Sequence, residues 1–516
     1  MLATTGLLLL LVILLTTLLL TWRWRHFSYF KRLGIPGPRP NLLWGNLMEY
    51  HSTDLYKVIG RWIEKYGDIY GFYNGDVPFV VTTDLDLIEQ VCVRNFKNFM
   101  NRGVTMATMQ QHPYLGRSVL HVPAPYWKNI RSSVATIFSP VKLKQMMPSL
   151  EKDVNIYLSS LEQYAETGEE VHMLRMYEPF AMDLTGRRCF GIPEQIQDNP
   201  DHETLGLAKH TANDGMTGAL HMVGQCVGSL GPFMKPLCFL SLLPVRFHFR
   251  KMEVQKRIET RIKDPSSRKP DILQHLIEAK YVEREAANGA KQEENGISKS
   301  RPLTTDEVII SAGTLCLAGF ETMASSLSYV TFTLAQHPDV QEKVREEVRE
   351  AVREQGTLDY DTVMKKLNYL EQVMNETLRL YPPGLTFVTR EAKEDFQYKE
   401  LKFKAGTCFM VPLYQIMRDA RFWPEPLEFR PESTRFSPEN EDKLNKRAFL
   451  AFGIGPRNCL GMKIAVLYLK FTIAKLVQKY CFQLGPSQKG EMTLASHAMV
   501  SEPSEGPWVI LRHVKP

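Results

Sequence analysis

The sequence contains no Cys-x-x-Cys pair, although it has eight cysteines among its 516 residues. Structural zinc sites and disulfide frameworks depend on closely or regularly spaced cysteines, so neither class fits this chain. Reduced thiols on the cytosolic side are the simplest interpretation. The cysteines stand at positions 92, 189, 226, 238, 316, 408, 459 and 481.

Strong charge of one sign is also missing, and the chain has no internal repeat. A net charge of +6 is too weak to indicate nucleic-acid binding, but it fits a mild attraction to an anionic membrane or an acidic partner. With 44% hydrophobic and 23% charged residues, the composition excludes disordered, collagenous and polytopic membrane proteins. No flavin or nicotinamide fingerprint is visible either.

The N-terminus differs from the rest because Met1–Trp22 carries no charged side chain. As a helix this stretch would extend ~33 Å, which matches a bilayer core of ~30 Å. Basic and aromatic residues follow from Arg23, which predicts a cytosolic location for the remaining chain. A cleaved signal peptide is the alternative, but it would begin with basic residues and have a shorter apolar stretch. We predict a single-pass transmembrane anchor over 1–22, a basic, proline-rich hinge over 23–40 that acts as a stiff spacer, and a globular domain over 41–516.

The globular part is mostly helical in pattern, with short β-like runs at Pro78–Thr82 and Cys408–Pro412. We therefore predict a mainly α fold with small β-sheets. Residues 281–301 are polar and are predicted to form a solvated loop. Residues 218–249 are apolar, and either a buried helix pair or an amphipathic surface that dips into lipid headgroups explains them.

One long helix is predicted from Thr305, which can cap it, to His337-Pro338, where the proline ends it. Its middle reads Ala-Gly-Phe-Glu-Thr and ends at Thr322. The small Gly319 leaves room beside the helix, and the pair Glu321–Thr322 can pass protons. A threonine hydroxyl that bonds to the carbonyl one turn back is the structural alternative.

The strongest signal is Phe-Gly-Ile-Gly-Pro-Arg-Asn-Cys-Leu-Gly, which runs from Phe452 to Gly461. Two glycines before Cys459 allow a tight loop around the sulfur. The helical pattern of Met462–Gln478 places Cys459 near a helix N-terminus, where the helix dipole and Arg457 would favour a thiolate. A thiolate ligand pushes electron density onto haem iron and favours O–O cleavage. A buried structural cysteine is the alternative for an isolated residue.

This ten-residue arrangement resembles the cysteine-ligand signature of the cytochrome P450 superfamily, and the resemblance covers nearly the whole chain. Phe452, Gly455, Arg457, Cys459 and Gly461 match the signature. Within the superfamily the chain is most similar to the microsomal 3A-type drug oxidases and thromboxane synthase. That closer likeness rests on Asn95–Arg102, Trp127–Arg131 and Glu376–Pro383.

The resemblance implies the cytochrome P450 fold, with haem b (iron protoporphyrin IX) between the long central helix and the cysteine-ligand loop. It makes Cys459 the iron ligand and gives the Thr322 hydroxyl, beside Glu321, a role in protonating bound dioxygen. Phe452 and Gly461 belong to the cofactor-binding loop. Haem propionates would be held by Trp127, Arg131, Arg390 and Arg457, although a solvated surface is the commoner state of any single arginine.

Glu376 and Arg379 stand at i and i+3 on one predicted helix face. The family buries this pair together with a third arginine beneath the haem loop. The expected third motif carries two extra residues here, so Arg435 is predicted to be the third member and Arg430 is its rival.

Three functions are compatible with these features. The first is a monooxygenase that inserts one atom of dioxygen into a xenobiotic, steroid or fatty acid. The second is a thromboxane-synthase-like isomerase of a peroxide, against which Glu321–Thr322 argues. The third is a membrane-tethered haem sensor, for which no output domain is visible.

The expected location is the endoplasmic reticulum membrane, with the catalytic domain in the cytosol. The expected partners are NADPH–cytochrome P450 reductase, optionally cytochrome b5, membrane lipid and a lipophilic small molecule, but no nucleic acid. A basic patch for an acidic reductase would comprise Lys128, Lys142, Lys144, Lys446, Arg447 and Lys463, unless these are ordinary solvated side chains. The substrate pocket is expected to draw on residues 106–121, 218–249, 311–315, 384–389 and 495–500.

Overall fold

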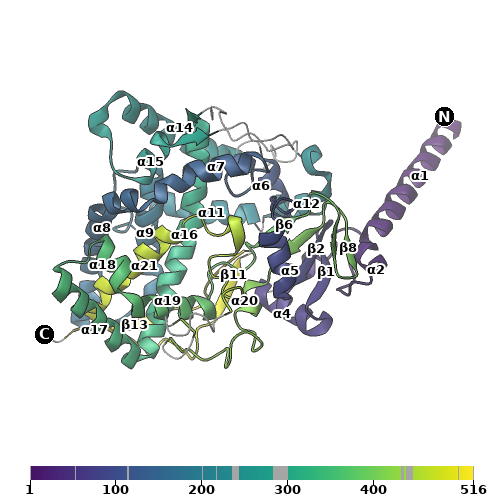
Figure 1. Cartoon of the computed structure of the whole chain (residues 1–516). Coiled ribbons are helices and arrows are strands. Elements are labelled where there is room, and N and C mark those ends of the chain that lie inside the picture. Colours follow the sequence, from purple (N-terminus) through teal and green to yellow (C-terminus); the bar gives the residue numbers. More distant parts are fainter. Residues whose placement is uncertain are drawn as a thin grey trace, which may run out of the picture.

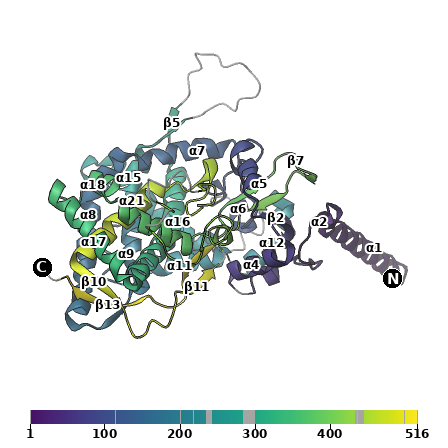
Figure 2. The same cartoon turned by 60° about the horizontal axis from the view of Figure 1, so that its bottom comes forward.

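A long apolar helix projects from a mainly helical body, with the β1–β2 sheet near this helix and strands β10 and β13 at the opposite end (Figures 1 and 2). The computed structural model describes residues 2–52, 54–112, 115–199, 201–216, 218–234, 243–282, 300–431, 435–436, 445–497 and 499–514. The predicted fold class, mainly α with small sheets, is confirmed.

Helices of very different length make up the body. The α-helices are α1 (Leu2–Phe27), α2 (Tyr29–Arg32), α3 (Leu47–Tyr50), α4 (Leu55–Tyr66), α5 (Leu85–Glu89), α6 (Ala107–Gln111), α7 (Tyr126–Ala135), α8 (Pro140–Thr167), α9 (Met173–Met182), α10 (Arg188–Phe190), α11 (Glu203–Met216), α12 (Ala219–Gln225), α14 (Leu243–Lys263), α15 (Ile272–Glu278), α16 (Thr305–Gln336), α17 (Pro338–Gln355), α18 (Tyr360–Lys366), α19 (Asn368–Leu380), α20 (Leu413–Ile416) and α21 (Met462–Lys479). Short 3-10 or π turns are η1 (Gln90–Arg94), η2 (Leu115–Arg117), η3 (Thr136–Phe138), η4 (Asp183–Arg187), η5 (Gly228–Met234), η6 (Pro265–Ser267) and η8 (Gly455–Arg457).

The strands form small separate sheets. The largest has the order β1 (Ile69–Asn74), β2 (Val77–Thr82), β9 (Cys408–Met410) and β6 (Thr389–Glu391), with β2 and β9 parallel. A second sheet has the order β10 (Tyr480–Leu484), β13 (Trp508–His513) and β3 (Glu170–His172). The remaining pairs are β11 (Leu494–His497) with β12 (Val500–Pro503), β4 (Lys280–Val282) with β5 (Ser300–Pro302), and β7 (Phe396–Tyr398) with β8 (Leu401–Phe403).

Helix α16 crosses the middle of the body and packs against α9, α15, α19 and α21 (Figure 1). Most of its side chains are buried, as its apolar composition predicts. Its cap is Thr304 rather than the predicted Thr305. The Thr304 hydroxyl accepts from the Glu307 N–H at 3.3 Å, and the Glu307 carboxylate accepts from the Thr304 N–H at 2.8 Å. Glu307 therefore selects the residue three positions before it as the cap.

The predicted polar loop over 281–301 is partly wrong, because its two ends pair as β4 and β5. Residues 283–299 lie outside the described part of the chain.

The N-terminal helix extends beyond the predicted anchor boundary at Trp22 and ends at Phe27. The helical span 4–27 is long enough to cross a membrane and contains a strongly apolar window of 18 residues, none of which is buried in the protein. The segment 23–40, which is predicted to be a stiff spacer, contacts the body of the protein. The Gly71 N–H of β1 donates to the Pro36 carbonyl at 2.9 Å, and a Cβ at Gly37 would clash with the Gly71 carbonyl. The proline-rich segment therefore lies against the sheet.

Candidate active site

The loop before Cys459 has the tight backbone that its glycines predict. Gly453 and Gly455 have φ angles of 74° and 73°, in the region that favours glycine. A Cβ on Gly455 would clash with the Cys92 carbonyl oxygen in η1, so the loop and η1 approach too closely for any side chain there. The Cys459 N–H donates to the Phe452 carbonyl at 2.7 Å. Helix α21 begins three residues after the cysteine, at Met462, as predicted.

The Cys459 side chain opens onto an internal cavity, which we call the thiol cavity. Its empty volume is about 1630 Å³, and α7, α16 and the cysteine loop contribute to its lining. The thiol is exposed to this cavity although it lies deep within the body of the protein. Phe452, Gly461 and Thr322 also line the cavity, so the structure brings the cysteine loop and the middle of α16 to one space.

Burial raises the pKa of the Cys459 thiol above its ordinary value, and this effect outweighs the groups that favour a thiolate. Those groups are the Gly461 N–H and the positive charges of Arg131 and Arg102. Arg457, which was predicted to help, points elsewhere: its Nε donates to the Met100 carbonyl at 2.7 Å. A metal cation bound to the sulfur is the kind of group that would deprotonate such a buried thiol.

Three arginines, Arg102, Arg131 and Arg457, line the thiol cavity, and Arg390 contacts the cysteine loop beside it. We call these four the cavity arginines. Within the described residues none of them forms an ion pair with a carboxylate. Burial, together with the charges of the other three, lowers the pKa of Arg457 to about 7, and burial chiefly lowers the pKa of Arg102 to about 9. An anion bound among these guanidinium groups would relieve this repulsion.

The hydrogen bonds of the cavity arginines go to neutral acceptors. Arg131 Nη2 donates to Asn458 Oδ1 at 2.8 Å, and Arg390 Nη2 donates to the Ile454 carbonyl at 3.1 Å. Arg102 Nε and Arg390 Nε are buried without a partner. Trp127, one turn before Arg131 on α7, is buried beneath Arg457, whose guanidinium carbon lies 4.2 Å from the centre of the Trp127 rings.

These residues fit a haem group. Haem carries two propionate carboxylates, and unpaired buried guanidinium donors are their natural partners. A cysteine sulfur that faces the same cavity fits the iron. Of the residues predicted to hold the cofactor, Trp127, Arg131, Phe452, Arg457, Cys459 and Gly461 all line the thiol cavity, and Arg390 contacts the cysteine loop.

Thr322 and Glu321 face different spaces. The Thr322 hydroxyl donates to the Ala318 carbonyl at 2.7 Å, which is the bond of the structural alternative, while the side chain still lines the thiol cavity. Glu321 lines a second pocket, which adjoins the thiol cavity, since Thr314 and Ala318 of α16 line both. The room predicted beside Gly319 is partly filled, since a Cβ there would lie 2.9 Å from Thr185 Cγ2 in η4.

Glu376, Arg379 and Arg435 form a buried ion cluster. Arg379 Nε and Nη2 donate to the two Glu376 oxygens at 2.7 and 2.9 Å, and Arg435 Nη1 also pairs with Glu376. The rival Arg430 contributes only its backbone N–H at 3.1 Å, while its half-exposed side chain pairs with Glu425 and Glu428. The Arg435 side chain therefore occupies the third position.

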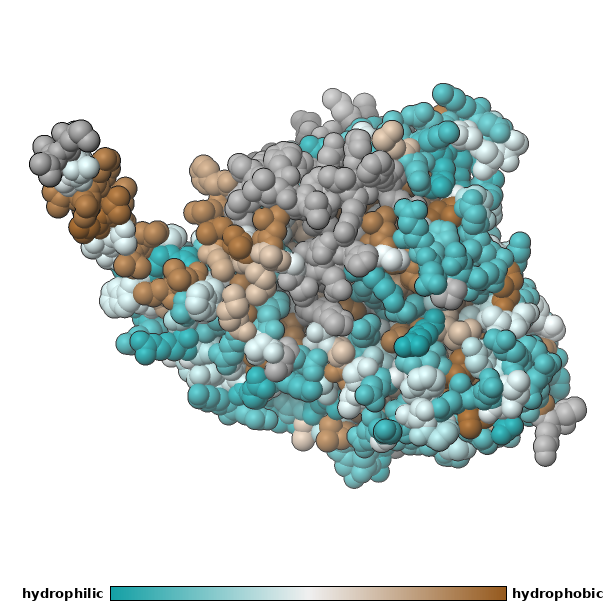
Figure 3. All heavy atoms as spheres, turned by 180° about the vertical axis from the view of Figure 1, so that it is seen from behind, coloured by the Kyte–Doolittle hydropathy of each residue, from teal (hydrophilic) through white to brown (hydrophobic). Residues whose placement is uncertain are grey.

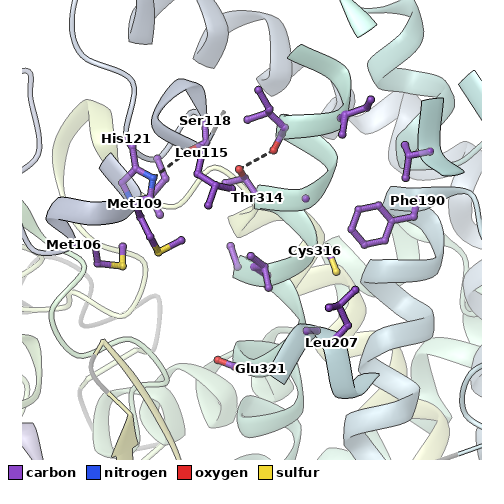
Figure 4. Close-up of a pocket in the computed structure, with 18 of the residues that line it drawn as sticks. Met106, Met109, Leu115, Ser118, His121, Phe190, Leu207, Thr314, Cys316 and Glu321 are labelled. Atoms are coloured by element: carbon purple, nitrogen blue, oxygen red, sulfur yellow. Dashed lines mark hydrogen bonds between the residues drawn. The ribbon is translucent and has the colours of Figure 1, made fainter. Parts of the chain in front are cut away.

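The second pocket, which we call the apolar pocket, has an empty volume of about 1340 Å³ and lies beside α16. Figure 4 shows His121 and Ser118 on one side of it, Phe190 and Leu207 on the other, and Thr314 between them. Its lining is mostly apolar, made by methionine, leucine, isoleucine, valine, alanine and phenylalanine side chains. His121 Nε2 and Thr204 Oγ1 are buried polar atoms of this lining without a partner. Burial and nearby Arg102 lower the pKa of His121 to about 4, so its ring is neutral.

Four of the five predicted pocket segments reach the apolar pocket, through residues that include Met106, Thr314, Phe387 and Val500. The described residues of 218–249 do not line it. Sequence reasoning missed the opposite wall, made by Phe190, Thr204, Leu207, Ala208, Lys251 and Val254. It also missed Arg102 as a cavity arginine, and no local pattern distinguishes this arginine from a surface one.

The chain is similar to proteins of one known family. The model of the Cytochrome P450 family matches residues 35–509. Cytochrome P450 3A1 of Rattus norvegicus is 33% identical over 89% of this chain and 87% of its own length. Cytochrome P450 3A14 of Cavia porcellus is 30% identical over 94% and 92%, and Cytochrome P450 3A6 of Oryctolagus cuniculus is 31% identical over 88% and 87%. The predicted resemblance to the 3A-type oxidases is confirmed.

Proposed function

Because this chain belongs to the cytochrome P450 family and is a monooxygenase of that family, we propose that it hydroxylates neutral lipophilic molecules with electrons from an NADPH-dependent reductase. The observation that carries the proposal is the thiol cavity, where Cys459 and three arginines without a carboxylate partner line one space large enough for a cofactor, with Arg390 beside them on the cysteine loop. The proposed cofactor is haem b, which supplies the activation of dioxygen when it is bound.

The proposed role of Cys459 is to ligate the iron as a thiolate, with the Gly461 N–H directed at its sulfur. Arg102, Arg131, Arg390, Arg457 and the Trp127 indole would hold the propionates. The buried ion cluster ties α19 to the segment around Pro426 and Glu428, since Arg379 Nη1 donates to the Pro426 carbonyl at 2.7 Å. It would thereby keep the support of the cysteine loop rigid.

Thr322 is proposed to deliver protons on the distal side. Its hydroxyl donates its own proton to Ala318, so its oxygen keeps lone pairs that can accept a hydrogen bond from water or a protonated oxygen in the cavity. Glu321, on the neighbouring face of α16, is proposed to connect this hydroxyl to the apolar pocket as a proton donor.

The apolar pocket favours neutral substrates such as xenobiotics or steroids over fatty acids. Lys251 is the cation at its edge, and it already pairs with Asp306 at 2.7 Å. A carboxylate would have to compete for that lysine. The neutral His121 ring offers a hydrogen bond and no charge. Methionines in the lining allow the pocket to adapt to ligands of different shape.

A separate reductase is the proposed electron source, with cytochrome b5 as a second donor. The predicted basic patch is partly neutralised: Lys142 pairs with Glu278 at 2.9 Å, and Arg447 pairs with Asp86 and Glu89 at 2.7 and 2.8 Å. Lys144 pairs with Asp361. Lys128 and Lys463 are exposed and carry no ion pair within the described ranges. We propose that these two lysines make the main charge contacts with the reductase.

Helix α1 is the proposed single-pass anchor in the endoplasmic reticulum membrane, with the body on the cytosolic side. Its exposed leucines and isoleucine support this role, because a soluble protein does not leave such a helix in water.

A mass-spectrometric assay with labelled dioxygen tests the proposed reaction. The full-length protein, a P450 reductase and NADPH should place one labelled oxygen atom in products formed from a mixture of lipophiles. A peroxide isomerase would instead convert a lipid peroxide without NADPH and incorporate no label. Product formation that does not require NADPH would overturn the monooxygenase proposal.

The proton-delivery role is tested by Thr322→Ala. We expect less product per NADPH and more hydrogen peroxide, because the variant lacks the hydroxyl that would pass protons into the thiol cavity. Ser326→Ala is the matched control, since Ser326 also lines the thiol cavity and donates to the carbonyl one turn back at 2.7 Å. Equal coupling in both variants would remove Thr322 from the relay.

A further inference from the structure

The last turn of the anchor helix is docked on the body of the protein. Arg23 is only 8% exposed, and its guanidinium donates from Nε to the Leu42 carbonyl at 2.9 Å and from Nη2 to the Leu43 carbonyl at 2.5 Å. Nη1 reaches the Cys226 carbonyl at 3.3 Å. The residue predicted to mark the cytosolic membrane interface is therefore enclosed by protein.

Asp76 receives this arginine at the turn between β1 and β2. Its carboxylate is fully buried, and Oδ2 lies 3.5 Å from Arg23 Nη1. The same carboxylate accepts from the Ser229 N–H at 2.9 Å and from the Ser229 hydroxyl at 2.5 Å. His26, three residues after Arg23, contacts the Asp76 backbone carbonyl through Nε2 at 2.5 Å. One acidic side chain thus holds the anchor helix and η5, which are far apart in the sequence.

The hairpin turn is shaped to receive α12 and η5. A Cβ on Gly75 would clash with the Gln225 carbonyl, so the close approach requires glycine, whose φ is 69° here. The Asp76 N–H donates to that carbonyl at 3.2 Å, and Gln225 Nε2 donates to the Asn74 carbonyl at 3.1 Å. The α12–η5 segment is therefore fixed to the turn by several independent bonds.

Exposed apolar side chains surround this junction, and we call them the apolar shoulder: Leu43, Val223, Leu230 and Phe233. Phe233 is 86% exposed and Leu43 is 63% exposed. Leu43 accepts from Arg23 through its own carbonyl, and Leu230 follows Ser229 directly, so both belong to the junction. Figure 3 shows apolar side chains on the body beside the base of the anchor helix.

We propose that Arg23, Asp76 and Ser229 form a clamp that fixes the anchor helix to the body, so that the apolar shoulder rests in the same lipid surface that the helix enters. The proposal rests on the anchor role given above. A lipid surface is the occupant because the shoulder continues directly from a helix whose exposed side chains already require lipid. The clamp holds Arg23 away from the headgroups, so orientation depends on a protein contact rather than on lipid charge.

Crosslinking in vesicles tests the clamp. The full-length holoprotein is inserted into phosphatidylcholine vesicles that contain a photoactivatable lipid, and crosslinked peptides are mapped by mass spectrometry. We expect crosslinks in α1 and in the peptide that carries Leu230 and Phe233. In Arg23→Gln the shoulder crosslinks should fall several-fold, because α1 is released and the body can tilt.

Arg25→Gln is the matched control, since Arg25 is exposed and its side chain makes no hydrogen bond in the described part of the chain. It removes the same charge two residues away and should leave the shoulder crosslinks unchanged. Ser229→Ala should produce a smaller loss than Arg23→Gln, and the reduced CO-bound spectrum of each variant reports whether the haem site is intact.

Equal shoulder crosslinking in Arg23→Gln and Arg25→Gln, or none in the unmodified protein, would overturn the clamp. If α1 itself is not crosslinked, the anchor role fails as well. Crosslinks in α1 without crosslinks in the shoulder reject only the clamp.

Discussion

Two groups of arginines in the body of the protein, the buried ion cluster and the cavity arginines, differ in what balances their charge. In the buried ion cluster, Arg379 and Arg435 share the Glu376 carboxylate, and their remaining donors reach backbone carbonyls. The four cavity arginines have no carboxylate within the described residues, and two of their Nε atoms have no partner. The first group is complete as folded, whereas the second requires an anion from outside the chain.

The comparison separates residues that hold the fold from residues that await a ligand. Burial alone does not distinguish them, because Arg379, Arg390 and Arg457 are all at most 4% exposed. What distinguishes them is the partner. A buried charge with a partner belongs to the scaffold, and a buried charge without one marks a binding site.

The largest effect is expected from Glu376→Gln, which removes the charge that both cluster arginines share. Breaking a buried ion pair costs ~3–5 kcal/mol because lone buried charges remain. Urea unfolding of the holoprotein, followed by haem absorbance and far-UV circular dichroism, measures the loss. A change below the cost of an ordinary surface substitution would mean that the cluster is not the completed scaffold described here.

A smaller effect, which depends on whether haem is bound, is expected from Arg457→Gln. Losing a charge-assisted bond to a propionate should cost about 1.5–3 kcal/mol in haem affinity, or roughly 10- to 150-fold faster haem loss. The haem-free protein should be destabilised less than the holoprotein, because removing one of four like charges offsets part of the loss of the hydrogen bonds that Arg457 donates to backbone carbonyls. Transfer of haem to an excess of acceptor protein measures the loss. Equal destabilisation with and without haem would place Arg457 with the scaffold.

Glu391 directly follows Arg390 on β6, but it does not neutralise the charge of Arg390. Successive residues of a strand face opposite sides, and burial raises the pKa of Glu391 to about 7. Because the pKa of Glu391 is higher in the folded protein than its ordinary value, the protonated carboxyl favours folding over the charged one. Its contribution to the free energy of unfolding is fully present below about pH 4.5 and is lost as pH rises through 7.

Glu391→Gln should therefore stabilise the protein at pH 8 by about 1–2 kcal/mol and have little effect at pH 4. Thermal unfolding of both proteins across this pH range is the measurement. A stabilisation that is equal at pH 4 and pH 8 would rule out the buried, unpaired carboxyl as its cause.

The smallest effect is expected from Arg430→Ala. The Arg430 side chain is 41% exposed and pairs only with exposed glutamates, and such pairs contribute about 0–1 kcal/mol. Its contact with Glu376 uses the backbone N–H, which alanine keeps. Urea unfolding should place this variant close to the unmodified protein, and far from Arg435→Ala. If Arg430→Ala and Arg435→Ala are equally destabilised, the assignment of the third arginine is wrong.

Local signals predicted the centre of the site. The glycines before Cys459, the helix that follows it and the long apolar helix with Thr322 are encoded by residues close in sequence, so the pattern alone located them. The cap of α16 was misplaced by one residue because two adjacent threonines compete, and the position of Glu307 decides between them.

Long-range packing set what the sequence did not reveal. Arg102 joins the cavity arginines because its segment is brought to α7 and the cysteine loop by the fold. The far wall of the apolar pocket comes from α10, α11 and α14, which no motif links to the cysteine. From the sequence, Arg23 is predicted to lie at the membrane interface. Its partner in the structure, Asp76, lies 53 positions away, so no local pattern links the two.

The reduced, CO-bound absorption spectrum tests the central claim, that the Cys459 thiolate binds haem iron in the thiol cavity, most directly. We expect the full-length protein to show the long-wavelength band that is typical of thiolate ligation. We expect Cys459→Ala to lose both this band and the haem. A Cys459→Ala protein that keeps both the haem and this band would contradict the account.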